Sequence, residues 1–153
     1  MINPKYINPF FMWALVVIGA SFCLKFLPAN HLFSLGIWGK ILSAASVLFW
    51  LYVASRGLSS HRQAAKSVAG IDKIITSGIF RMVRHPLYLA HIIVTWGIIM
   101  QIPSPRALAV AAWLTLVLIL WAKLEEYGLE KKFGQAYGIY KKTTPMFLPR
   151  FWK

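Results

Sequence analysis

Polar and charged side chains crowd into one stretch of this otherwise apolar chain, residues 77–88, which reads Ser-Gly-Ile-Phe-Arg-Met-Val-Arg-His-Pro-Leu-Tyr. Arg81 and Arg84 carry permanent charges, and each can grip a carboxylate through two parallel hydrogen bonds. His85 precedes Pro86, and proline disfavours a helical backbone before it while suiting the first position of a new helix. The stretch therefore predicts a basic corner that leads into a helix and can bind an anionic group.

The helix after this corner is predicted to carry a polar face. Tyr88, His91 and Thr95 are spaced at i, i+3 and i+7, so they share one side. Gly78 can take a positive φ at low cost, which allows a tight turn before the corner. The alternative interpretation is a basic loop that only anchors a membrane helix at lipid headgroups. His91 is either a hydrogen-bonded interior histidine or a base for a thiol or amine, and this stays open.

Acidic residues are scarce, and most of them lie together. The chain has four Asp and Glu against seventeen Lys and Arg, and three of the four acids are Glu125, Glu126 and Glu130. A carboxylate dragged towards the bilayer centre costs up to about 2.5–3.5 kcal/mol, so an adjacent pair at the edge of an apolar run is a candidate functional site. The alternative is that the pair forms ion pairs with Arg81 or Arg84 and only holds the helices together.

The composition predicts an integral membrane protein. The 153 residues suffice for one domain, 1–153, and 58% of them are hydrophobic while 14% are charged, which leaves too little polar surface for a soluble globule. A net charge of +13 is typical of nucleic-acid binding, but the long apolar runs favour basic loops that meet anionic lipid headgroups, and no nucleic-acid partner is expected. Cys23 is the one cysteine and the histidines lack metal-site spacing, so neither a disulfide nor a metal site is expected.

Four apolar runs predict four membrane-spanning helices. The spans lie at about 9–27, 35–55, 87–102 and 107–122. Pro103-Ser104-Pro105 joins the last two, which are expected to form a tightly paired helical hairpin. The predicted fold is an all-α integral membrane bundle with this helix-turn-helix hairpin.

Two further helices are predicted outside the spans. Ser59 or Ser60 can cap a short helix that runs through about Val68. After the last span, apolar and aromatic residues recur on one face of an interfacial amphipathic helix, at Leu129, Phe133, Tyr137 and Tyr140. Lysine and arginine gather in residues 56–84 and in the tail after 122, which predicts that both segments and both termini face the cytosol.

The C-terminal half resembles the isoprenylcysteine carboxyl methyltransferase family and its phospholipid-methyltransferase relatives. The matching pieces are the run from Thr76 to Tyr88, the pair Glu125-Glu126, then Phe133-Gly134, Tyr137, Tyr140 and Pro149. The resemblance implies an integral membrane enzyme that uses S-adenosylmethionine. It also implies a lipophilic small-molecule or lipid-anchored acceptor, with a carboxylate, thiol or amine, that enters from the lipid side.

The resemblance places His85, Tyr88, Glu125 and Glu126 at the cofactor. The chemistry of S-adenosylmethionine extends this set, because arginine suits its carboxylate and tyrosine suits its adenine or its sulfonium. The predicted cofactor-binding residues are Arg81, Arg84, His85, Tyr88, Glu125, Glu126 and Tyr137, and the predicted catalytic residues are His85, Arg84 and Glu126. Which glutamate contacts the cofactor stays open.

Two other functions compete with methyl transfer. One is a membrane lipid or sterol reductase that uses NADPH, and the other is a non-catalytic protein that binds anionic lipid. The lipid-binding interpretation predicts that Glu125 and Glu126 are dispensable. The methyltransferase interpretation predicts that Glu126→Gln loses cofactor affinity while the protein stays folded.

Overall fold

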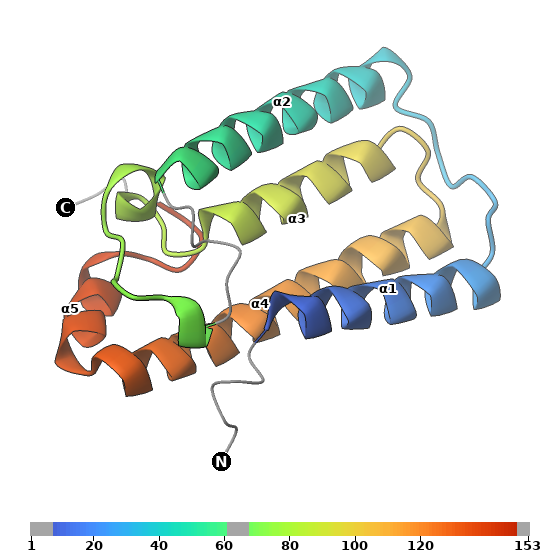
Figure 1. The fold of residues 1–153 in the computed structure, drawn as a ribbon. Coiled ribbons are helices and arrows are strands. Elements are labelled where there is room, and N and C mark those ends of the chain that lie inside the picture. The colour runs from blue at the N-terminus through green and yellow to red at the C-terminus, as the bar shows by residue number, and fades with distance from the viewer. Residues whose placement is uncertain (1–7, 61–67, 150–153) are drawn as a thin grey trace.

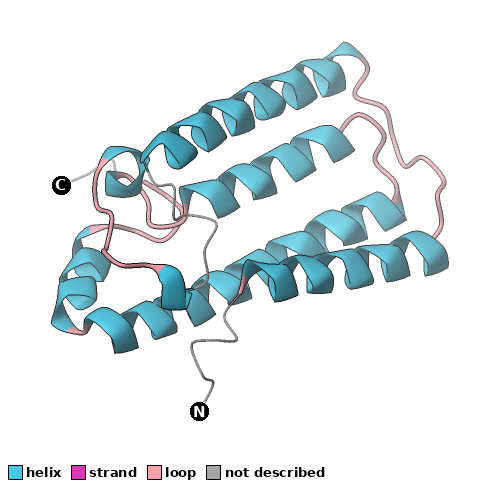
Figure 2. Cartoon of the chain, viewed as in Figure 1, coloured by secondary structure: helices cyan, strands magenta, loops and turns pink. Residues whose placement is uncertain are grey.

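The computed structural model describes residues 8–60 and 68–149, and within these ranges it consists of helices and loops (Figure 2). The helices are α1 (Pro9–Phe26), α2 (Ile37–Ser60), α3 (Pro86–Ile99), α4 (Pro105–Phe133) and α5 (Gln135–Thr143). Two short 3₁₀ turns, η2 (Val68–Gly70) and η3 (Gly78–Arg81), lie between α2 and α3. The predicted all-α fold is confirmed. The short helix predicted between Ser60 and Val68 lies outside the described residues.

Helix starts follow local signals in the sequence. α1, α3 and α4 each begin at a proline, where the missing N–H costs no helical hydrogen bond. The Asn8 side chain caps α1 by accepting from the Phe10 N–H, and Ser104 caps α4 by accepting from the Ala107 N–H. Gly78 has a φ of 61°, so the tight turn predicted before α3 is confirmed.

Three helices, α1, α2 and α4, are long and apolar enough to cross a membrane. Large apolar side chains on α1 and α2, such as Phe10, Phe22 and Trp38, are more than 60% exposed, which suits lipid rather than water. The third predicted span forms α3, whose 14 residues measure about 21 Å at 1.5 Å per residue, short of the ~30 Å hydrocarbon core. The chain is an integral membrane helical bundle in which α3 is shorter than that thickness.

The last predicted span continues well beyond residue 122. α4 has 29 residues and measures about 43 Å, so its last turns reach past a hydrocarbon core of about 30 Å. The amphipathic helix predicted through residues 129–140 is divided between the end of α4 and α5. Gly134 separates them with a φ of +55°, a conformation that glycine adopts without a steric penalty.

The four long helices form two pairs, with α2 beside α3 and α1 beside α4 (Figure 1). The predicted hairpin of α3 and α4 is present, and α3 packs still more extensively on α2 than on α4. Small residues explain this: a Cβ at Gly97 would lie 2.1 Å from the Ser46 Oγ on α2. The side chain of Gln101 also donates to the Ser43 Oγ at 2.6 Å.

Indole N–H groups join the remaining helices. The Trp113 Nε1 on α4 donates to the Leu15 carbonyl on α1 at 3.0 Å. The Trp96 Nε1 on α3 donates to the Thr115 Oγ1 on α4 at 3.1 Å. These bonds fix α4 between α1 and α3, and the extended end of α4 then projects beside the start of α3 (Figure 1).

Candidate functional site

A pocket lies where the start of α3, the extended end of α4 and the helix α5 meet. Its walls come from six segments of the chain. The lining side chains are Ile71, Lys73, Ile74 and Ile75 of the loop before η3, Phe80 of η3, Arg84 and His85 of the corner, Pro86, Leu87 and Tyr88 of α3, Glu125 and Leu129 of α4, and Tyr137 and Tyr140 of α5. The basic corner and the glutamate pair therefore meet at one site, as the sequence predicts.

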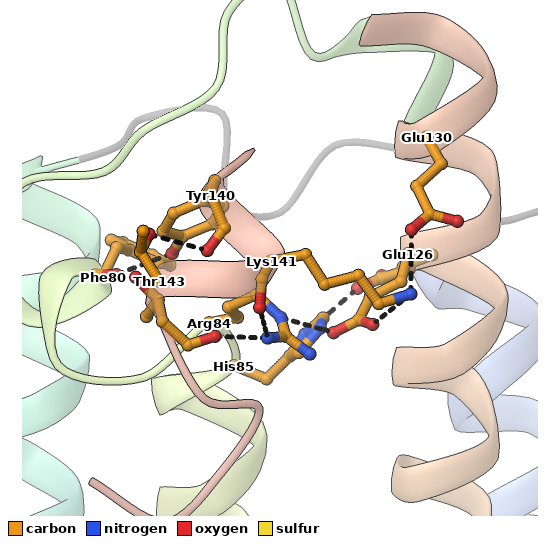
Figure 3. A network of polar contacts seen from close by, with 10 residues as sticks. Phe80, Arg84, His85, Glu126, Glu130, Tyr140, Lys141 and Thr143 are labelled. Atoms are coloured by element: carbon orange, nitrogen blue, oxygen red, sulfur yellow. Dashed lines mark hydrogen bonds and ion pairs between the residues drawn. The ribbon is translucent and has the colours of Figure 1, made fainter. Parts of the chain in front are cut away.

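Glu126 is the centre of the polar network beside this pocket (Figure 3). One carboxylate oxygen, Oε1, accepts from the Arg84 Nε at 2.8 Å and lies 3.2 Å from the His85 Nε2. The other oxygen, Oε2, lies 3.4 Å from the Lys141 Nζ. The Glu126 side chain is only 4% exposed, so the charge is buried and depends on these partners.

Arg84 also fastens the C-terminal segment to the corner. Its Nη1 donates to the carbonyls of Lys141 and Thr144, which stabilises the carbonyl end of α5 (Figure 3). The backbone N–H of Arg84 donates to the Pro145 carbonyl at 2.9 Å. The backbone N–H of His85 donates to the Met146 carbonyl at 3.1 Å. Two nitrogens of the Arg84 guanidinium, Nε and Nη1, thus already donate hydrogen bonds to protein groups.

Glu125 has a different environment from its neighbour. Its Oε1 accepts from the Tyr88 hydroxyl at 2.7 Å, and its Oε2 lies 3.7 Å from the His85 Nδ1. The rings of His85 and Tyr88 stack with centroids 5.6 Å apart. Glu125 lines the pocket with a side chain that is 18% exposed, whereas Glu126 is not among the lining residues.

Two phenols of α5 close the pocket on the side of the C-terminal segment. The Tyr140 hydroxyl donates to the Phe80 carbonyl at 2.6 Å, which joins α5 to η3 (Figure 3). Burial raises the pKa of Tyr140 to about 12, and it raises the pKa of Tyr137 by more. Both phenols are therefore neutral at physiological pH. A hydrogen bond to Glu130 at 2.8 Å is the main cause that raises the pKa of Lys141. The ammonium of Lys141 therefore stays charged beside Glu126.

The structure brings together six of the seven predicted site residues. Arg84, His85, Tyr88, Glu125, Glu126 and Tyr137 lie in the pocket wall or in the network beside it. Arg81 does not join them: its side chain is exposed at the end of η3, and no described contact connects it to the network. Trp121, one helical turn before Glu125, is buried in the core with Met12 and Val16 and does not line the pocket.

Sequence reasoning missed the loop of residues 71–75. It contributes Lys73 and three isoleucines to the lining of the pocket, which Glu125 also lines. Its signal in the sequence is the run Ile-Asp-Lys-Ile-Ile, which places three apolar residues in a connection between two helices. A lining that includes a carboxylate on α4, an ammonium on this loop and several apolar side chains suits a ligand that carries both charges and an apolar group.

Comparison with known proteins supports a membrane methyltransferase family. Residues 24–136 match the phospholipid methyltransferase family, which covers α1 from Leu24 onward, α2, α3, α4 and the start of α5. The chain belongs to this family. The match includes both the basic corner and the glutamate pair.

Curated relatives of this family member are methanethiol S-methyltransferases. The one from a Pseudomonas species is 29% identical over 123 residues, which is 78% of this chain and 44% of the relative. The one from Crocosphaera subtropica is 31% identical over 77 residues, which is 50% of this chain and 29% of the relative. The chain thus spans less than half the length of these relatives. No solved structure matches it.

Proposed function

We propose that this chain is an S-adenosylmethionine-dependent methyltransferase of the membrane that acts on a lipophilic, membrane-accessible acceptor. The observation that carries the proposal is the pocket that is lined both by Glu125, which contacts Tyr88 and His85, and by Lys73 of the loop 71–75. The family and the names of the relatives support methyl transfer. The sulfonium of the cofactor would supply the methyl group.

The lining residues fit the amino-acid end of the cofactor. Glu125 would accept hydrogen bonds from its α-ammonium, because this carboxylate is held in place by Tyr88 and faces the pocket. Lys73 would bind its carboxylate, since Arg84 is already engaged by Glu126 and by the C-terminal carbonyls. The isoleucines of the loop and Leu129 would pack on the adenine.

The predicted catalytic residues take positioning roles in this proposal. Arg84 and Glu126 hold the corner, α4 and the C-terminal segment together, and His85 sets the orientation of Glu125 and Tyr88. Methyl transfer is a direct displacement, so fixing the two reactants in line supplies much of the rate. The basic residues around 56–84 and in the tail would place the pocket at the cytosolic surface, while the acceptor reaches it from the bilayer.

Calorimetric binding of S-adenosylmethionine and S-adenosylhomocysteine to the detergent-purified protein tests the proposal. We expect micromolar binding of both, weakened at least about tenfold by Lys73→Gln, which corresponds to about 1.4 kcal/mol. Arg81→Gln is the matched control, because this exposed cation lies outside the pocket and its loss is expected to leave affinity unchanged. Absence of binding, together with binding of NADPH, would instead support the reductase.

A further inference from the structure

The 3₁₀ turn η3 lies where the apolar part of α2 ends. A Cβ added at Gly57 of α2 would lie 3.5 Å from the Ile79 Cδ1 of η3, so the two segments are in close contact. Arg56, the residue before Gly57, is the first charged residue of α2 after Lys40. The cations that flank an apolar membrane helix lie at the level of the lipid headgroups, so η3 lies at that level too.

η3 has an inner side and an outer side. Phe80 lines the pocket, and its carbonyl accepts a hydrogen bond from the Tyr140 hydroxyl of α5. Arg81 and Met82, which follow Phe80 directly, are exposed instead, and Met82 is 57% exposed. An arginine beside an exposed methionine at the end of a membrane helix suits a ligand that offers both a phosphate and an acyl chain.

The same pairing of a cation with an exposed apolar side chain occurs on both elements that contact η3. On α2, the Arg56 guanidinium lies over the Tyr52 ring, 5.7 Å from its centroid, and Tyr52 is 55% exposed. On α5, Lys142 is exposed one turn from Ile139, which is 58% exposed. α2, η3 and α5 contain no Asp or Glu. We call these three pairs the η3 surface, which consists of Tyr52, Arg56, Arg81, Met82, Ile139 and Lys142.

We propose that the η3 surface binds an anionic phospholipid. Arg81 donates to the lipid phosphate, because no described carboxylate engages its guanidinium. Met82 and Ile139 contact the acyl chains, while Arg56 and Lys142 add to the attraction for the negative headgroup. The surface lies outside the pocket, so this inference does not depend on the proposed function.

A lipid fits the η3 surface better than a soluble anion does. A free phosphate could bind Arg81 but would leave Met82 and Ile139 in water, where apolar area is costly to expose. The lipid-exposed face of α2 also continues up to this surface, since Leu48, one turn before Tyr52, is 65% exposed. A phospholipid bound there has its chains along α2 and its headgroup at η3.

Native mass spectrometry of the protein released from nanodiscs tests the proposal. The nanodiscs contain phosphatidylcholine and phosphatidylglycerol, and the measured quantity is the phosphatidylglycerol that each protein retains. We expect the wild-type protein to retain phosphatidylglycerol in preference to phosphatidylcholine. Arg81→Gln is expected to weaken this retention about fivefold, which is the usual contribution of one cation at an anionic membrane surface. Thermal unfolding in detergent, expected to be unchanged, shows that the variant is folded.

Two further variants separate a built site from general attraction between charges. Lys40→Gln removes an exposed cation near the start of α2, at the opposite end of the same helix, and is expected to leave retention unchanged. Met82→Gln keeps every charge and a similar side-chain length but replaces an apolar contact with an amide. It is therefore expected to weaken retention of phosphatidylglycerol, although the attraction for the phosphate is the same.

A loss of retention in Arg81→Gln and in Met82→Gln, with Lys40→Gln unaffected, would support the lipid site. Equal losses in Arg81→Gln and Lys40→Gln, or no loss in Arg81→Gln, would overturn the site, because net charge alone would then account for the binding. Unchanged retention in Met82→Gln, or displacement of the lipid by soluble glycerol phosphate, would overturn the phospholipid as the occupant.

Discussion

At the scale of single residues, two adjacent glutamates do different work because of what surrounds them. Glu126 is buried against Arg84, His85 and Lys141, so its charge is balanced entirely by protein groups. Glu125 is held by Tyr88 but faces the pocket, where a ligand can reach it. A buried ion pair that loses one partner leaves an uncompensated charge, which costs more than the pair itself contributes.

We therefore expect opposite phenotypes for the two amide substitutions. Glu125→Gln should weaken binding of S-adenosylmethionine while the protein keeps its melting temperature in detergent. Glu126→Gln should destabilise the fold by about 3–5 kcal/mol, because the Arg84 guanidinium loses its counter-charge in a buried position. Thermal unfolding and calorimetric binding on the same samples measure both effects. A Glu126→Gln protein of unchanged stability with lost cofactor affinity would reverse the assignment.

At the scale of elements, close helix contacts set where the site can form. α2 and α3 approach through small residues, and the Gly97 Cα lies against Ser46 with no room for a side chain. α5 ends at carbonyls that Arg84 caps, which attaches this short helix to the corner. The pocket thus depends on two kinds of packing, apolar in the bundle and polar at its end.

Two glycine substitutions separate these contributions. Gly97→Ala would put a methyl group 2.1 Å from the Ser46 Oγ, so we expect a loss of about 1–3 kcal/mol from overpacking. Gly138→Ala meets nothing within 4 Å and should stabilise α5 by up to about 1 kcal/mol. Melting temperatures of the two variants in detergent measure both effects. Equal stability for the two would show that the α2–α3 contact is looser than the structure indicates.

At the scale of the whole molecule, the site lies at one end of the bundle. The start of α3, the far end of α4 and the C-terminal segment meet there, opposite the loops that join α1 to α2 and α3 to α4 (Figure 1). α4 is longer than the hydrocarbon core is thick, and its glutamates come after the apolar part of the helix. Under the proposed function, a polar cofactor and a lipophilic acceptor would then approach from different phases.

Cysteine labelling tests which end faces the cytosol. With Cys23 replaced by serine, single cysteines are introduced at Ser34, in the loop between α1 and α2, and at Lys142, on α5. We expect a membrane-impermeant maleimide to label Ser34→Cys in intact cells and Lys142→Cys only after permeabilisation, because basic segments stay in the cytosol. The reverse pattern would place the pocket on the outer side.

Local signals in the sequence determined the membrane class, most helix starts and the turn before the corner. Each depends on neighbouring residues: the length of an apolar run, a proline at the first helical position, or a glycine that can take a positive φ. The same motifs indicated that the corner and the glutamate pair belong together. The match to the phospholipid methyltransferase family then confirmed the resemblance that these motifs had indicated.

Only the tertiary structure decided how those residues divide their roles. Glu125 and Glu126 are neighbours in sequence, but a helix points adjacent side chains in different directions, so one meets Arg84 and the other meets the pocket. The guanidinium of Arg84 is engaged by carbonyls some sixty residues away, and Lys73 reaches the pocket from a loop without a motif. Such contacts depend on how distant segments pack, which no local pattern of residues encodes.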